Sequence, residues 1–173
     1  MNESNVRLRA LEPEDLELLY QIENDRELWN VGVTNVPYSR YTLHEYIASQ
    51  KGDIYVDRQV RMMIENNVGE TVGIADIVNF DPQHRKAEVG IIVLNGQRRQ
   101  GFALEALRQL ADYATSTLHL HQLYAYVDVD NEPSLMLFKK AGYSDGAVLA
   151  QWLFDGKNYH DVVLMQHFCE KVL

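Results

Sequence analysis

The fold of this chain is decided by the stretch Val89–Leu110, VGIIVLNGQRRQGFALEALRQL. It opens on the apolar run VGIIVL, which is dense enough to indicate a strand buried on both faces. After Gly101, apolar side chains recur at helical spacing. We therefore expect a central strand over Lys86–Leu94, a short polar loop, and a helix over Gln100–Thr117.

The loop Asn95–Gln100 places Arg98 and Arg99 directly before this helix. The first N–H groups of a helix have no partner within it, and the helix dipole favours negative charge there. Two arginines add positive charge at the same place. The pattern indicates a phosphate site, although glycine and arginine in such a turn can also serve only the turn and its solubility.

Length and composition narrow the class of protein. A chain of 173 residues buries about two thirds of its unfolded surface, so we expect one domain over residues 1–173. The net charge of −9 argues against a nucleic-acid partner; it suits a soluble protein and can attract a cationic substrate.

The sequence also predicts where the protein resides. No apolar run approaches the ~18 residues that span a bilayer, and the N-terminus lacks the pattern of a signal peptide. The single Cys169 cannot form an internal disulfide, which fits a reducing compartment. We expect a cytoplasmic protein without a membrane partner and without a metal site.

Periodicity and turn residues predict the remaining elements. Strands are expected at Asn5–Ala10, Val60–Glu65, Thr71–Phe80, Lys86–Leu94, His121–Asp130, Ala147–Phe154 and Asn158–Phe168. Helices are expected from Pro13 to about Asn24, over Leu43–Gln50 after a Thr42/Glu45 capping box, over Gln100–Thr117, and from Asn131 to Gly142. The segment Asp25–Tyr41, which includes Trp29, is expected to be a covering loop with a short helical turn.

The order of these elements predicts a fold class. A helix crosses over between Lys86–Leu94 and His121–Asp130, so these two strands should be parallel. The other neighbours are joined by hairpins or turns. We expect a mixed α/β (α+β) fold whose mostly antiparallel sheet contains one parallel crossover and is flanked by helices.

Several motifs resemble the GNAT superfamily of acyl-CoA-dependent N-acetyltransferases. The run Arg98–Ala103 is similar to the Gln/Arg-x-x-Gly-x-Gly/Ala motif of that family, and it stands between a strand and a long helix as it does there. The segment from Asn131 through Pro133 to Tyr143 resembles a second family element. The hairpin Asp155–Val162 resembles the branch that acetylates polyamines and ribosomal proteins. The resemblance covers nearly the whole chain and implies the GNAT fold.

The resemblance implies acetyl-CoA as co-substrate. Its pyrophosphate would lie on the backbone N–H groups of the Arg98–Ala103 turn, and its pantetheine arm would pair with the central strand as an added strand would. A backbone N–H near Ile92 or Val93 would polarise the acetyl carbonyl. The cofactor-binding residues expected are Ile91, Ile92, Val93, Arg98, Arg99, Gln100, Gly101, Phe102, Ala103, Leu104, Asn131, Ser134, Phe138 and Lys139.

The reaction also needs a base, because only a neutral amine attacks a thioester. Glu88 is the first candidate, since it interrupts an apolar strand where an unpaired carboxylate is unfavourable. Glu88 can equally be the partner of Arg85 or Lys86 in a salt bridge. Asp76 on the neighbouring strand is the second candidate base, or it binds the substrate's ammonium group.

One position departs from the family pattern. Where the resembling branch commonly has a tyrosine that protonates the leaving thiolate, this chain has Phe138. The proton would then come from Tyr143, from Tyr126 or from water. Alternatively, the protein is a non-catalytic module that binds acyl-CoA.

The expected acceptor is a primary amine of a small polyamine or diamine, attacked without a covalent enzyme intermediate. A protein N-terminus is the rival acceptor. Polyamine acetyltransferases that resemble this chain carry acidic residues in a loop that corresponds to Thr34–Thr42, where this sequence has none, so a regulatory polyamine site is not expected there. The strand edges of the last hairpin make a homo-oligomer a further hypothesis.

Overall fold

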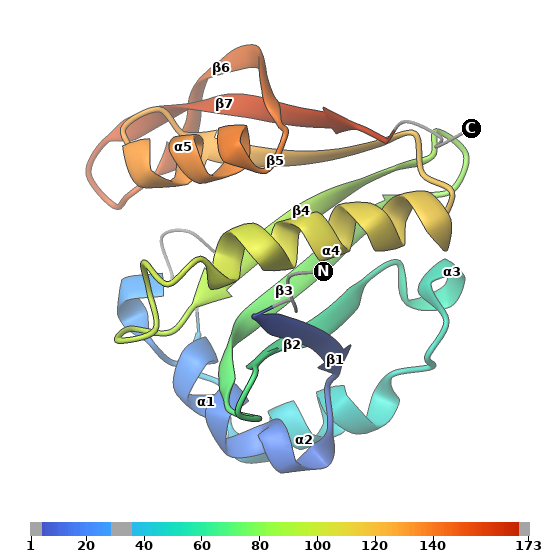
Figure 1. Cartoon of the computed structure of the whole chain (residues 1–173). Helices are drawn as coiled ribbons and strands as arrows, with labels where there is room; N and C mark the ends of the chain where they lie inside the picture. Colours follow the sequence, from blue (N-terminus) through green and yellow to red (C-terminus); the bar gives the residue numbers. More distant parts are fainter. Residues whose placement is uncertain (1–4, 29–35, 170–173) are drawn as a thin grey trace.

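A computed structural model describes residues 5–28 and 36–169. Its centre is a seven-stranded sheet of order β1-β2-β3-β4-β5-β7-β6 (Figure 1). All neighbouring strands are antiparallel except β4 and β5, which are parallel as expected. The strands are β1 (Val6–Ala10), β2 (Val60–Asn66), β3 (Thr71–Asp81), β4 (Lys86–Val93), β5 (Gln122–Asp128), β6 (Ser144–Phe154) and β7 (Tyr159–Phe168). The predicted fold class is confirmed.

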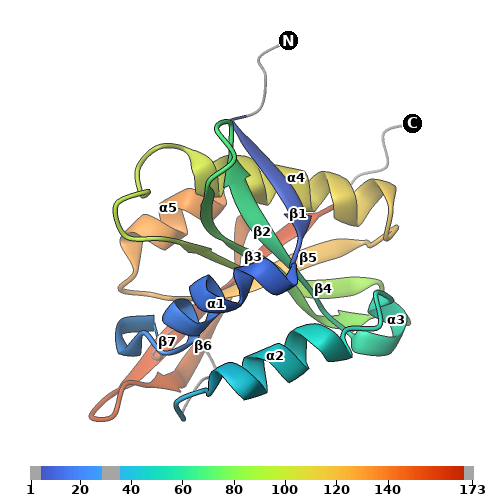
Figure 2. The ribbon, with the colours of Figure 1, turned by 90° about the horizontal axis from the view of Figure 1, so that it is seen from below.

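Helices cover the sheet unevenly. They are α1 (Leu16–Glu23), α2 (Arg40–Ser49), α3 (Ile54–Asp57), α4 (Phe102–Ser116) and α5 (Glu132–Lys140), with 3-10 turns at Pro13–Asp15 and Arg26–Leu28. Helices α1 and α2 lie on one face of the β1–β4 half, and α4 lies on the other (Figures 1 and 2). Helix α5 packs beside α4, against the β5–β7 half. No helix in the described ranges is both long and apolar enough to cross a bilayer.

The two faces of the β1–β4 half have separate cores. Toward α1 and α2, the buried residues are Leu19, Ile22, Leu43, Met63 and Ile74. Toward α4, a larger cluster joins the sheet to the buried stripe of that helix, which comprises Phe102, Ala106, Leu107, Leu110, Ala111 and Ala114. This double burial explains why β4 reads as a nearly continuous apolar run.

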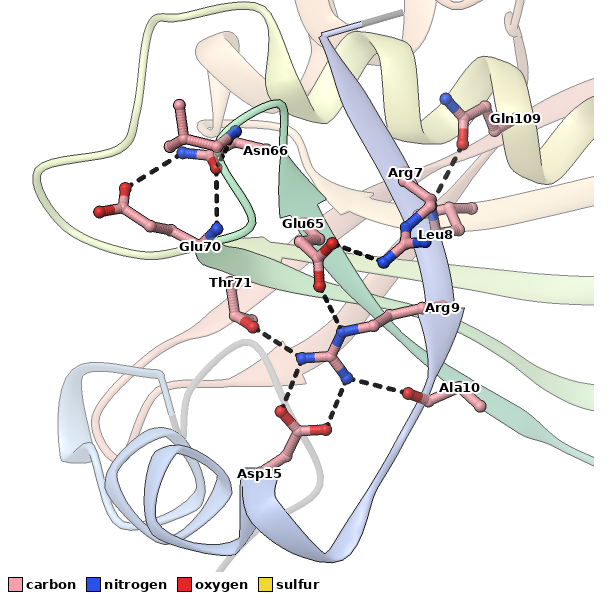
Figure 3. A network of polar contacts seen from close by, with 11 residues as sticks. Arg7, Leu8, Arg9, Ala10, Asp15, Glu65, Asn66, Glu70, Thr71 and Gln109 are labelled. Carbon is pink, nitrogen blue, oxygen red and sulfur yellow. Dashed lines mark hydrogen bonds and ion pairs between the residues drawn. The ribbon is translucent and has the colours of Figure 1, made fainter.

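An arginine network fastens the first strand to its surroundings (Figure 3). Arg9 donates to both carboxylate oxygens of the buried Asp15, each at 2.8 Å, and to Glu65 at 2.8 Å and Thr71 at 2.9 Å. Arg9 holds the pKa of Asp15 below its usual range, against the opposing effect of burial. On the same strand, Leu8 N–H donates to Gln109 of α4. Strand β1 is thereby tied to α1, β2 and α4.

The start of α2 corrects one prediction. The helix begins at Arg40, and its cap is Ser39, whose hydroxyl accepts a hydrogen bond from Thr42 N–H at 3.0 Å. The Thr42/Glu45 pair is therefore not the capping box, because Thr42 is already inside the first turn. The cap of this helix therefore lies three positions earlier than the sequence pattern predicts.

Other boundaries also differ. Helix α3 was not predicted, because four residues capped by Asp53 are too short for a periodic signal. Strand β6 begins at Ser144 rather than Ala147. Of the covering loop expected over Asp25–Tyr41, residues 29–35, including Trp29, lie outside the described residues.

The parallel pair is short. Ladder partners are Lys86↔Gln122, Ala87↔Leu123 and Glu88↔Tyr124, after which β4 continues to Val93 and β5 to Asp128. Beyond Glu88, no ladder pair joins the two strands within the described ranges. Figure 1 shows them diverging toward the end of the molecule where α4 begins. The sheet is thus split between its two halves.

Candidate active site

The split leaves one edge of β4 unpaired. On its other side β4 is hydrogen-bonded to β3, with Ile92 opposite Ile74 and Val93 opposite Gly73. Leu94 N–H also donates to Val72 O at 2.9 Å. Since N–H groups alternate in direction along a strand, those of Ile91 and Val93 point toward the split. An extended ligand can add to this edge as a further strand.

The loop from β4 to α4 presents backbone donors at the same end. Three residues have left-handed backbone angles: Gly96 (φ 86°), Arg99 (φ 63°) and Gly101 (φ 85°). Glu105 N–H bonds to Gly101 O at 3.1 Å, so the N–H groups of Phe102, Ala103 and Leu104 precede the first internal bond of α4. A Cβ at Gly101 would meet nothing within 4 Å, so the loop is open on this side.

The two arginines of the loop differ in their contacts. Arg98 folds back and donates from Nε to Val93 O at 3.1 Å, which braces the loop against the end of β4. Arg99 and Gln100 are exposed. The predicted anion site is therefore a set of backbone N–H groups flanked by positive charge at the mouth of the split.

Helix α5 borders the split from the β5 side. Its cap is Asn131, whose side-chain oxygen accepts from Ser134 N–H at 3.2 Å, as predicted. Lys139, in the last turn, pairs with Asp145 at 3.1 Å and is exposed. Asn131 and Ser134 thus lie at the start of the helix that follows β5, whereas Lys139 lies at its other end.

Glu88 stands where the split begins. It belongs to the last parallel pair, opposite Tyr124, and is half-buried. Its carboxylate accepts a hydrogen bond from the Asn79 amide at 2.8 Å. In the described part of the chain, neither Arg85 nor Lys86 pairs with it, and Arg85 donates instead to His119 O at 2.8 Å. The salt bridge considered as an alternative role for Glu88 is thus not formed.

Asp76 has a different environment. Arg61 holds both of its carboxylate oxygens, at 2.9 and 2.8 Å, and also pairs with Glu23. A carboxylate held at both oxygens by one guanidinium is occupied by that contact and is less accessible to a substrate amine. Of the two candidate bases, the structure leaves Glu88 available and engages Asp76.

Comparison with known proteins decides the family. The acetyltransferase (GNAT) domain family matches residues 5–144. This chain belongs to that family. It is 26% identical over 170 residues to the spermidine N(1)-acetyltransferase of Vibrio cholerae. The aligned region covers 98% of this chain and 96% of the relative.

Solved structures of spermidine N-acetyltransferases have the same fold as this chain. The spermidine N-acetyltransferase of Vibrio cholerae in complex with CoA and spermine superposes with a TM-score of 0.84, at 27% identity and 96% coverage of each chain. A dodecameric structure of the Vibrio cholerae enzyme gives a TM-score of 0.81 at 28% identity, covering 99% of this chain and 98% of that one. The protein is accordingly a GNAT N-acetyltransferase that uses acetyl-CoA.

The GNAT assignment makes Phe138 and Tyr143 important, because a leaving thiolate needs a proton. Phe138 is 4% exposed and packs edge-on against Tyr143, with ring centroids 5.0 Å apart. The Tyr143 hydroxyl is buried without a hydrogen-bond partner in the described residues. Burial, with a smaller effect of Cys169, raises the pKa of Tyr143, so this tyrosine is a poor acid.

Two residues beside Glu88 were not singled out from the sequence. Asn79 reaches Glu88 from a bulge in β3, where its φ is 51°. Burial raises the pKa of Tyr124 to about 12, with further contributions from Glu88, Tyr126 and Asp81. The alternation in β5 was the available signal, because Leu123, Ala125 and Val127 are buried on one face and Tyr124 and Tyr126 must then point to the other.

A carboxylate cluster lies at the far end of β5. Atoms of Asp128, Asp130 and His160 that could bind a metal lie within 4.8 Å of one another. His160 also contacts Asp155 at 2.8 Å, and these carboxylates, Asp155 first, raise the pKa of the imidazole. The imidazolium thus offsets part of the negative charge of these carboxylates. That no metal is needed stays a prediction.

Proposed function

We propose that this GNAT enzyme transfers the acetyl group of acetyl-CoA to a primary amine of a linear polyamine. The observation that carries the proposal is the position of Glu88, a carboxylate without a cationic partner in the described residues, at the point where the sheet splits. The polyamine acceptors named for the Vibrio cholerae relatives support the substrate class. The net charge of −9 favours the approach of a polycation.

In the proposed reaction the pantetheine arm lies along the free edge of β4, and the pyrophosphate lies on the N–H groups of Phe102–Leu104. The neutral amine attacks the thioester carbonyl, and Glu88 accepts the proton that the nitrogen loses. The N–H of Val93, which faces the split, stabilises the oxyanion. The C–S bond then breaks, and the CoA thiolate takes a proton from water or from the exposed Tyr126 hydroxyl, because Phe138 has none to give and the Tyr143 hydroxyl is a poor donor.

The test is release of CoA thiol with spermidine, spermine, putrescine or an N-terminal alanine peptide supplied separately. We expect turnover with a polyamine and none with the peptide. Turnover with the peptide alone would establish the protein N-terminus as acceptor. Calorimetric binding of CoA without turnover of any amine would instead identify a non-catalytic acyl-CoA-binding module.

We further propose that the 173 residues act as one domain in the cytoplasm and associate with copies of themselves. Strand β6 is an edge strand of the sheet and is exposed over most of its length. An uncovered edge of this length favours pairing with another chain. The dodecameric structure of the Vibrio cholerae enzyme is consistent with an oligomer.

A further inference from the structure

Three aromatic side chains form a continuous strip next to Glu88. The ring centroids of Tyr124 and Tyr126 are 5.7 Å apart, and those of Tyr126 and Trp152 are 5.6 Å apart with 32° between the ring planes. Tyr126 is 37% exposed and Trp152 is 54% exposed. We call Tyr124, Tyr126 and Trp152 the aromatic strip.

An irregularity in β6 accompanies the position of Trp152. Four positions separate Leu149 from Leu153 on β6, whereas only two separate their partners Val162 and His160 on β7. The extra residues form a bulge in which Gln151 has φ 50° and donates its N–H to Asp161 at 2.8 Å. Such bulges change the direction of a side chain, here the indole of Trp152, which reaches over β7 to contact the ring of Tyr126 on β5.

Carboxylates lie at both ends of the strip. Glu88 is the ladder partner of Tyr124, and Asp128 follows Tyr126 by two residues on the same face of β5. In the described ranges, the arginines that lie over aromatic rings lie over Tyr20 and Tyr46, so no guanidinium covers the strip. Asp128 is paired with His160 at 3.3 Å, so the carboxylate at the strip without a cationic partner in the described residues is Glu88. The strip is a set of accessible π faces beside that negative charge, which is an environment suited to an ammonium group.

We propose that the aromatic strip binds the second ammonium group of a linear diamine or polyamine whose reacting amine lies at Glu88. This inference rests on the proposed function and names how the acceptor is recognised. Two residues along a strand advance about 6.8 Å, close to the extended separation of two nitrogens that are joined by a butylene chain and longer than that of a propylene chain. A substrate extended from Glu88 along β5 would place its next ammonium group at Tyr126, where the indole of Trp152 lies beside the phenol ring.

The first test compares acceptors in steady-state kinetics. Trp152→Ala should raise the KM for spermidine by about 3- to 30-fold, the range expected when one cation–π contact is lost. It should leave kcat for spermidine, and kcat/KM for propylamine, within about twofold of the wild type, since a monoamine has no second ammonium group. Trp152→Phe should restore most of the affinity.

Tyr159→Ala is the matched control. Tyr159 is also an exposed aromatic residue of the same hairpin, at 64% exposure, and stacks on Phe154 with centroids 4.9 Å apart. It lies outside the strip, so the spermidine KM should not change. Equal KM changes in both variants would mean that the hairpin acts only structurally, and would overturn the proposal.

The second test reads binding without turnover. The chain has two tryptophans, so Trp29→Phe leaves Trp152 as the single tryptophan. In the presence of CoA, spermidine should change the Trp152 emission in a saturable manner and propylamine should not. An unchanged emission, or a change of oligomeric mass in Trp152→Ala by light scattering, would overturn the proposal; the latter would mean that a second copy covers the strip.

The outcomes separate the two proposals. If the wild type acetylates only the alanine peptide, the proposed polyamine function fails. If the wild type acetylates spermidine and Trp152→Ala has the wild-type KM for it, the polyamine function stands and the aromatic strip is not its recognition site.

Discussion

The two halves of the sheet, on either side of the split, are built differently. In the β1–β4 half, helices cover both faces, and the carboxylates of Asp15, Glu65 and Asp76 are held by arginines. In the β5–β7–β6 half, α5 covers one face, and Tyr126 and Trp152 are exposed. One half is a closed scaffold, and the other supplies the open surface at which a substrate can bind.

Asp76 and Glu88 show this difference most sharply. They lie on adjacent strands, one engaged by a guanidinium and the other by a neutral amide. A carboxylate paired with arginine contributes to stability, whereas the carboxylate of Glu88 has no cationic partner in the described residues and is free to contact a substrate. Position on the boundary between the halves, rather than residue type, separates their environments.

The largest expected effect is that of Glu88→Gln. If Glu88 is the base, kcat with the preferred amine should fall by about 10²- to 10⁴-fold, because the isosteric amide cannot accept the proton. Raising the pH should recover part of the loss, since more of the amine is then neutral. Thiol release with saturating acetyl-CoA measures both effects.

Asp76→Asn is the counterpart of that variant. It should reduce kcat by less than about 10-fold and instead lower the free energy of unfolding by about 1–3 kcal/mol, because Arg61 loses a bidentate partner. Denaturant unfolding checks the stability change. Equal losses of kcat in Glu88→Gln and Asp76→Asn would contradict the proposal that only Glu88 acts as the base.

A moderate effect is expected at the mouth of the split. Gly101→Ala should weaken CoA binding by about 10-fold, because its Cβ would project from the turn at which backbone N–H groups meet the pyrophosphate. Gly69→Ala is the control: Gly69 has φ 84° and equally open space, but lies in the β2–β3 turn. Both should lose similar stability. Calorimetric titration with CoA should separate them, and wild-type affinity in Gly101→Ala would contradict the predicted phosphate site.

A small effect is expected from Phe138→Tyr. If water protonates the thiolate, kcat should stay within about 3-fold, whereas restoring a missing general acid would raise it by about 10²-fold or more. Thermal unfolding serves as the control, because the new hydroxyl is placed in a buried site beside Tyr143. A large gain in kcat would show that the proton is limiting in the natural protein.

The smallest expected effect is a pH dependence of stability that arises from His160 and Asp155 in the β6–β7 hairpin. Asp155 is the main cause of the raised pKa of His160, and the pKa of Asp155 is itself lowered to about 2. A raised histidine pKa stabilises the folded state below about pH 6.5, and this contribution is lost as pH rises through the folded-state pKa. The lowered pKa of the Asp155 carboxyl stabilises the folded state above about pH 3.9, and this contribution is lost as pH falls toward 2.

NMR titration of the His160 ring should therefore give a pKa above that of an ordinary histidine, and Asp155→Asn should lower it. The thermal stability lost in His160→Gln should be larger at pH 5.5 than at pH 8.5, if the imidazolium form makes the contacts. A loss that grows with pH would contradict this sign.

The sequence predicted elements best where a local pattern was long. The sequence predicted the strand–loop–helix unit around Gly101, the cap at Asn131 and the parallel crossover. Burial and capping each constrain the types of several consecutive residues, so these features can be recognised from the sequence. The short α3 and the cap of α2 at Ser39 were not predicted, because one turn of helix and a competing capping pattern are too local to distinguish. The bulge that accompanies Trp152 leaves no periodic signal at all.

The candidate site divides in the same way. The prediction of a backbone anion site follows from chain order alone, since a helix that begins after a glycine turn presents free N–H groups wherever it lies. The choice between Glu88 and Asp76, the burial of the Tyr143 hydroxyl and the alignment of Tyr124, Tyr126 and Trp152 depend on partners far apart in sequence. Only the tertiary structure brings those partners together, because side-chain pairing across strands is set by register and packing and not by neighbouring residues.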